Sequence, residues 1–406
     1  MEGLARLAEA LFLLGGYNSA VVVLGAALLG AAAGAAGAFI FLRKRALVSD
    51  AVSHATLPGV CLAFIAMAAM GGDGRWLPGL IMGSALSAGL GLLAVEWMAR
   101  RTRLSEDAAI GAVLSVFFGF GIVLLTVIQT LSIGRQAGLE GFLLGSTAGM
   151  LASEAQVIAV AAALAGLAVW AMRRPMTLVA FDPEFAAASG VGVRRTDLAM
   201  MGLALMVTVI GLKILGLVLI VALLIIPAAA ARFWTDRVDR LIVIAAGIGA
   251  ASAWFGAALS AAGDGLPTGP VIVLVAFALF AGSLLFAPLR GAAASAWRHR
   301  AFEGRVHRRQ GLLAMARSEP IYDRLTLRVL RRGGLIRADG TATLEGRAAA
   351  ARAARDEARW AEVRRRHAGD PVLEAQDGLT PLEAVMTPDQ IAEIDRALAP
   401  SAAGPA

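Results

Sequence analysis

The sequence predicts an all-α polytopic membrane protein with about 8–9 transmembrane helices, followed by a small cytoplasmic α+β tail of winged-helix type. Of its 406 residues, 58% are hydrophobic and only 17% are charged, and the mean hydropathy is +0.72. A soluble globular protein of this length is not expected to have such a composition. Much of the charge follows Leu289, so we expect two domains, a transmembrane domain over residues 1–289 and a tail over residues 290–406.

Apolar stretches long enough to cross a bilayer recur along the first domain. The predicted spans are about residues 20–42, 50–70, 77–98, 108–131, 156–172, 198–231, 241–262 and 271–286. The sixth stretch is too long for one ordinary span and is interrupted between Gly211 and Gly216, so it is either two short crossings or one broken helix. These alternatives give about nine or about eight crossings. Residues 133–150 are expected to form an outer loop with a short or re-entrant helix.

Basic clusters mark one side of the predicted membrane domain. They are Arg43–Arg45, Arg100–Arg103, Arg173–Arg174 and Arg232–Arg240. Cytoplasmic loops of membrane proteins are rich in arginine and lysine, so these clusters place the N-terminus outside and the C-terminal tail in the cytoplasm. The chain does not open with the pattern of a signal peptide. The net charge of +7 follows from the same loops and calls for no nucleic-acid partner.

Asp50 and His54 are the first candidate functional residues. They stand four positions apart at the start of a span, and on a helix that spacing places both side chains on one face. His54 is the only histidine outside the charged tail, and an ionisable side chain at membrane depth is costly enough to indicate function. A carboxylate and an imidazole so placed can bind one divalent cation. The alternative is that Asp50 caps a helix and His54 is a packed core residue.

The longest polar interval of the membrane domain, residues 173–197, contains the second candidate site. Its central part, Glu184–Gly190, is expected to form a short cytoplasmic helix that stops at the glycine. The alternative is a plain amphipathic helix in a loop.

The tail is predicted to contain helices at about residues 298–316, 322–330 and 345–366. A glycine pair at Gly333 and Gly334 stops the second of these helices. Residues 335–344 are then expected to form a hairpin that turns at Asp339-Gly340. Helix, stop, hairpin and helix is the order of elements in a winged helix.

Several classes of function are disfavoured by what the sequence lacks. The single cysteine, Cys61, excludes intramolecular disulfides and multi-cysteine metal sites. The chain contains no GxxxxGK[ST] phosphate loop and no HExxH motif. A transporter or channel is therefore favoured over an intramembrane enzyme, and the chain cannot bind ATP through a phosphate loop of its own.

Five motifs occur together in an order typical of one family. They are Ala46–Ala55, Arg101–Gly111 with Phe117–Phe118, Gly138–Gly145, Gly216–Arg232 and Leu266–Pro270. As an ordered set, over roughly residues 17–288, they resemble the membrane permease subunit of ABC importers for manganese, zinc and iron.

The resemblance implies a multi-pass permease of the bacterial inner membrane that works with a separate ABC ATPase. It also implies a second permease subunit, either a second copy or a sister permease, and an extracytoplasmic metal-binding protein. The cargo would be Mn(II), Fe(II) or Zn(II), with no permanently bound cofactor, and Asp50 and His54 would line its path. Asp182, Glu184, Ala187 and Gly190 would belong to the coupling helix that docks on the ATPase. The competing class is a stand-alone secondary or passive metal transporter.

The tail resembles part of the diphtheria-toxin-repressor type of metalloregulator. The piece is incomplete, because Ala384 stands where that group has a metal-binding histidine beside the acid Glu383. A complete helix-turn-helix pair is also missing, so DNA binding by a membrane-anchored transcriptional sensor is not expected. The tail is expected to regulate the transporter or to contact another subunit. The alternative is a basic segment that lies on anionic membrane lipid.

Overall fold

The computed structural model describes residues 2–72, 74, 76–130, 150–263, 266–367, 379–380 and 382–398. The chain divides into two compact units, Met1–Ala294 and Ser295–Ala406, and each is described by itself. The predicted outer loop with a re-entrant helix falls almost entirely outside the described residues.

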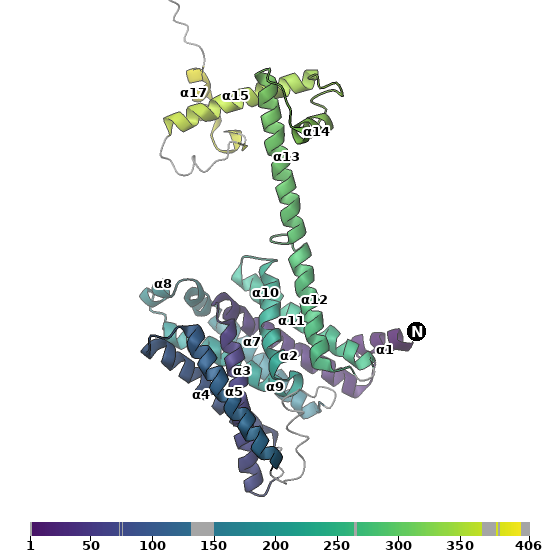
Figure 1. Ribbon diagram of the computed structural model, residues 1–406, viewed down its shortest axis with the longest axis vertical. Coiled ribbons are helices and arrows are strands. Elements are labelled where there is room, and N and C mark those ends of the chain that lie inside the picture. Colours follow the sequence, from purple (N-terminus) through teal and green to yellow (C-terminus); the bar gives the residue numbers. More distant parts are fainter. Residues whose placement is uncertain are drawn as a thin grey trace, which may run out of the picture. The chain divides into compact units, whose positions relative to one another are not determined.

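The first unit is a bundle of helices (Figure 1). Its elements are α1 (Glu2–Leu11), α2 (Tyr17–Leu42), α3 (Ala46–Ala69), α4 (Leu77–Arg101), α5 (Glu106–Thr130), α7 (Ala152–Phe181), α8 (Pro183–Ala188), α9 (Val193–Leu215), α10 (Leu217–Arg232), α11 (Val238–Ala262) and α12 (Thr268–Phe286). Within the described residues, 8 helices are long and apolar enough to cross a membrane, which agrees with the lower predicted count. The additional helix α10 is apolar but shorter.

Small residues bring the helices of this bundle into backbone contact. Helix α11 packs most extensively on α2, and Gly30 of α2 and Gly249 of α11 each face the other's carbonyl oxygen. A methyl group on either glycine would overlap the neighbouring backbone. The same arrangement joins α3 to α4 through Gly59 and Gly83. Close approach through small residues is a common way for helices to associate in lipid, where apolar side chains gain little from leaving the bilayer.

The long sixth stretch is two helices rather than one. Helix α9 ends and α10 begins at Gly216, whose φ of 79° lies in the left-handed region that glycine adopts most easily. Gly211 of α9 packs beneath the side chain of Ile220 of α10, so the chain folds back at this point. Of these two helices, only α9 is long enough to count as a span, so the break at Gly216 does not raise the number of full-length spans above 8 among the described residues.

The described part of the second unit is helical. Its elements are α13 (Ala292–Ala316), α14 (Arg324–Arg332), α15 (Leu344–Arg366), the 3₁₀ helix η1 (Leu382–Ala384) and α17 (Pro388–Leu398). Leu312 of α13, Leu330 of α14 and Ala350 of α15 share one apolar core. Trp360 of α15 and Ile394 of α17 belong to a second one.

The predicted α+β winged-helix tail is wrong for the described residues, because they contain no strand. The expected hairpin is reduced to a single antiparallel bridge between Ile336 and Ala342. The reason lies in Thr343, whose hydroxyl accepts a hydrogen bond from the backbone N–H of Gly346 at 3.0 Å and caps α15. The chain therefore enters a helix directly after the turn, and no residues remain to extend a second strand.

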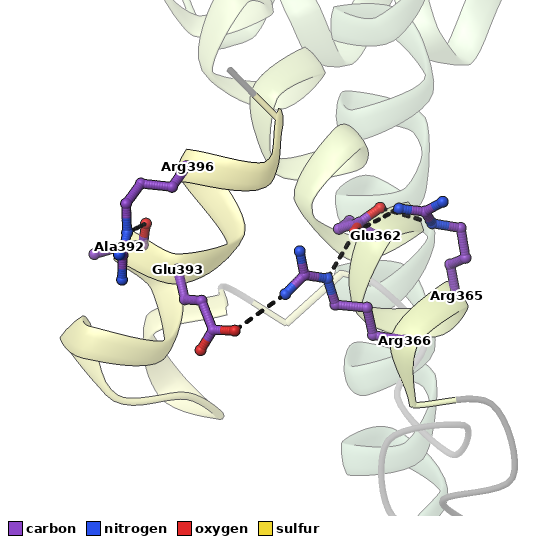
Figure 2. A network of polar contacts seen from close by, with 6 residues as sticks. All are labelled: Glu362, Arg365, Arg366, Ala392, Glu393 and Arg396. Atoms are coloured by element: carbon purple, nitrogen blue, oxygen red, sulfur yellow. Dashed lines mark hydrogen bonds and ion pairs between the residues drawn. The ribbon is translucent and has the colours of Figure 1, made fainter. Parts of the chain in front are cut away.

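Ion pairs between charged side chains connect α17 to α15 (Figure 2). The guanidinium of Arg366 donates to Glu362 at 2.7 Å on its own helix and to Glu393 of α17 at 3.2 Å. Hydrogen bonds from Arg365 and Arg366 lower the pKa of Glu362 to about 2, so this carboxylate stays ionised across the physiological range. Arg359 adds two hydrogen bonds to Asp395, at 2.7 and 2.6 Å.

Candidate metal path and coupling segment

The structure brings the two predicted metal-path residues together. Asp50 and His54 lie one turn apart on α3, with 3.6 Å between the His54 Nε2 and Asp50 Oδ1 atoms. The side chain of His54 is 18% exposed and that of Asp50 is 40% exposed. The pair is therefore a partly exposed ionisable spot on a mostly apolar helix.

The imidazole of His54 is held in place by an aromatic ring from another helix. Phe118 of α5 makes an edge-on contact with it, with 4.9 Å between ring centroids and 83° between ring planes. The Nδ1 atom of His54 is buried and has no hydrogen-bond partner among the described residues. Packing against Phe118, rather than a polar partner, thus fixes the ring while Nε2 faces Asp50. In the sequence, Phe118 was identified only as part of a family motif, and its contact with His54 was not predicted.

Pro58 changes the backbone next to the pair. It lies inside α3, and a proline has no N–H to donate to the carbonyl four residues earlier. That carbonyl belongs to His54, so its oxygen lacks the usual helical donor.

One chain supplies only part of a coordination sphere at this position. Among the described residues, no group of three or more histidine, cysteine, aspartate or glutamate side chains is placed to hold a metal ion. First-row metals bound by imidazole and carboxylate take four or more ligands. Asp50 and His54 together are two such side chains, fewer than that number.

The predicted coupling segment is a short, well-capped helix. The carboxylate of Asp182 accepts a hydrogen bond from the backbone N–H of Phe185 at 2.9 Å, and Pro183 occupies the first turn of α8. Gly190, with a φ of 81°, ends the segment as expected. The predicted Glu184–Gly190 helix is observed as Pro183–Ala188 followed by this glycine stop.

One face of α8 is buried and the other is open. Ala186 is fully buried in the main apolar core, whereas Phe185 is 58% exposed. The four predicted coupling residues, Asp182, Glu184, Ala187 and Gly190, are all exposed. The helix is thus anchored on the bundle and presents a mixed polar and aromatic surface outward.

An ionic cluster near this segment was not predicted. Arg43 makes two hydrogen bonds to Asp197 of α9, at 3.0 and 3.1 Å. Arg45 lies 3.6 Å from the same carboxylate and 2.8 Å from Glu106 of α5. In the sequence the two arginines indicated only the side of the membrane, and no local pattern pairs residue 43 with residue 197.

The family model described as the ABC 3 transport family matches residues 18–287. The chain belongs to this family. It is therefore a multi-pass membrane subunit of an ABC transport system rather than an enzyme, and ATP hydrolysis belongs to a separate subunit.

Two relatives with assigned transport systems align over most of the membrane domain. The manganese transport system membrane protein MntC of Bacillus subtilis is 41% identical over 298 residues, which cover 73% of this chain and 67% of the relative. The zinc transport system membrane protein TroC of Treponema pallidum is 37% identical over 284 residues, covering 70% of this chain and 94% of the relative.

A solved structure shares the fold. It is PsaBC from Streptococcus pneumoniae in complex with Fab, which superposes with a TM-score of 0.61 at 28% identity and covers 71% of this chain and 97% of that chain.

Proposed function

We propose that this chain is the permease subunit of an ABC importer that carries a first-row divalent metal across the bacterial cytoplasmic membrane. The observation that carries the proposal is the Asp50–His54 pair, held at 3.6 Å on a membrane helix of a family whose relatives are named for manganese and zinc transport. Imidazole with carboxylate suits Mn(II), Fe(II) and Zn(II) alike, so the pair sets the class of cargo rather than one metal.

The metal path is completed by a second permease subunit, which is either a second copy or a sister chain. Two side chains from one protomer are half of a tetrahedral set, and a symmetric partner would supply the other half. An extracytoplasmic metal-binding protein delivers the ion, and Asp50 and His54 take over part of its coordination shell during passage.

Helix α8 is the element that receives the motion of the ATPase. Its capped start, its glycine stop and its buried Ala186 make it a short rigid body. The exposed Glu184, Phe185 and Ala187 form the docking surface. This assignment places the arginine-rich end of the bundle and the tail in the cytoplasm, where ATP is available.

The test is metal uptake by the reconstituted importer, with wild-type chain and with His54→Ala. Because this change removes one of the two side chains proposed to contact the metal, we expect ATP-dependent uptake to fall by at least about tenfold while the complex still assembles. His299→Ala is the matched control, since His299 is a 71% exposed histidine of the tail. Uptake by His54→Ala at the wild-type rate would overturn the metal path, and uptake that continues without ATP would favour a secondary or passive transporter.

A further inference from the structure

Four charged side chains meet where one helix of the bundle ends and three others begin. We name Arg43, Arg45, Glu106 and Asp197 the Asp197 cluster. Helix α2 ends at Leu42, just before the two arginines, and α3 begins at Ala46, just after them. Helix α5 begins at Glu106 itself, and Asp197 lies in the second turn of α9.

The cluster surrounds one buried carboxylate and its charges balance, with Glu106 the most exposed member at 36%. The carboxylate of Asp197 is only 3% exposed, and the side chains of Arg43 and Arg45 are 20% and 17% exposed. Both Asp197 oxygens accept hydrogen bonds from Arg43, while Arg45 joins Asp197 to Glu106. A carboxylate so far from water is tolerated only when it is paired and hydrogen-bonded, so this geometry is strongly specified.

Through Asp197 the cluster is joined to the coupling segment. Helix α9 follows α8 after a short turn, and Ala186 of α8 is buried in the same apolar core against which Val191 and Val193 pack. A displacement of α8 is therefore passed to the first turns of α9, where Asp197 lies.

Through Arg45 and Glu106 the cluster is joined to the metal pair. Arg45 is the N-terminal flanking residue of α3, and Asp50 follows about 7.5 Å further along the helix axis. Glu106 starts α5, the helix whose Phe118 packs on the ring of His54. Both helices that hold His54 thus begin at the cluster.

We propose that the Asp197 cluster is the joint that transmits movement of the coupling helix α8 to the metal pair on α3, with Asp197 as the positioning residue. Apolar helix surfaces can slide past one another, whereas a two-point arginine–carboxylate contact is directional and resists sliding in a low-dielectric setting. This inference rests on the proposed function, because it assigns the element that couples ATP hydrolysis to the metal path.

The main test compares metal ions moved per ATP hydrolysed, using the complete importer in proteoliposomes. With Asp197→Asn, the two arginines lose their shared anion, so we expect hydrolysis to continue while metal moved per ATP falls by about fivefold or more. Asp236→Asn is the matched control, because Asp236 also lies between two arginines, Arg232 and Arg290, at 2.9 and 2.6 Å, but stands between α10 and α11, away from the starts of α3, α5 and α9 in the sequence. An Asp197→Asn complex that assembles and keeps the wild-type ratio would overturn the proposal.

A milder variant covers the case in which Asp197→Asn does not fold. Arg43→Lys keeps the positive charge but removes the second hydrogen bond to Asp197, so a smaller fall in the same ratio is expected. A contact that served only to hold the fold together would lower the yield of Arg43→Lys without changing the ratio, and that result would also overturn the proposal.

A readout without metal separates this inference from the proposed function. Leu47, between Arg45 and Asp50 on α3, is 56% exposed, whereas the native Cys61 is buried. In Leu47→Cys, we expect a non-hydrolysable ATP analogue to change the rate of maleimide labelling, and we expect Asp197→Asn to abolish that change. If the nucleotide changes the labelling rate in Leu47→Cys alone but not in Leu47→Cys with Asp197→Asn, the result supports the proposed role of the Asp197 cluster, whatever the cargo is. If the nucleotide changes the labelling rate equally in both proteins, the result contradicts that role.

Discussion

Single residues decide how closely the helices of this membrane domain approach one another. Gly30 and Gly249 are not needed for an unusual backbone conformation, since both lie within regular helices. Their role is steric, because each leaves room for the backbone carbonyl of the other helix. The same α2–α11 pairing continues at Gly34, which faces the carbonyl of Ala245. The close spacing of α2 and α11 therefore requires glycine, which has no Cβ atom, at these contact positions.

Two glycines of α11 allow this steric role to be tested within one helix. Gly249→Ala would force its methyl group against the carbonyl of Gly30, so we expect destabilisation of about 1–3 kcal/mol, typical of overpacking. Gly247→Ala is the matched control, because nothing lies within 4 Å of the position that its methyl group would occupy. Thermal unfolding of the purified protein in detergent should show a lower midpoint for Gly249→Ala only. Equal midpoints for the two variants would show that the pairing tolerates a wider spacing.

At the scale of elements, a short helix with strong signals at both ends can be located in the sequence as well as a long membrane span. Helix α8 is bounded by the Asp182 cap, by Pro183 and by Gly190, and its burial is confined to Ala186. This arrangement fixes its ends and its inner face and leaves the outer face free. An element built in this way can act as a rigid contact between two subunits.

The outer face of α8 is expected to bind the ATPase, which a charged, bulky substitution will test. Ala187→Arg places a long cation on this exposed surface without touching the buried Ala186, so we expect reduced co-purification of the ATPase and an unchanged yield of permease. Ala69→Arg is the control, since Ala69 is an exposed alanine at the end of α3 remote from its arginine-flanked start. Full recovery of ATPase with Ala187→Arg would indicate that another loop does the docking.

At the scale of the whole molecule, the chain combines two compact units of different character. The family match, over residues 18–287, falls within the first unit. The second has its own apolar cores around Leu330 and Trp360 and its own ion pairs between α15 and α17. Apolar cores and ion pairs of its own are what a separately folding part requires.

The tail is therefore predicted to be dispensable for the pore itself. A chain truncated after Arg300 should insert, assemble with the ATPase and move metal at a rate close to that of the full chain, because the proposed metal pair and α8 both precede the cut. Uptake and complex stability would be measured side by side, with the full-length chain as reference. A truncated complex that assembles but moves no metal would show that the tail belongs to the transport machinery. DNA retained specifically by the full chain, and not by the truncated one, would show that the tail binds DNA after all.

The sequence by itself determined the class of this protein and the local features of its candidate site. Hydropathy and length predicted the spans, and helical periodicity brought Asp50 and His54 together because residues four apart share a face. End signals predicted α8 within a residue or two. These are local properties, set by the chain's own geometry over a few turns.

Only the tertiary structure decided what lies around those local features. The contacts of Asp197 with Arg43 and of His54 with Phe118 join segments far apart in the sequence, and no spacing rule predicts which helices pack together. The predicted hairpin failed for a related reason, since its alternation was real but capping of the next helix by Thr343 competed for the same residues. Local patterns predict an element, and the choice between competing elements and partners follows from how the whole chain packs.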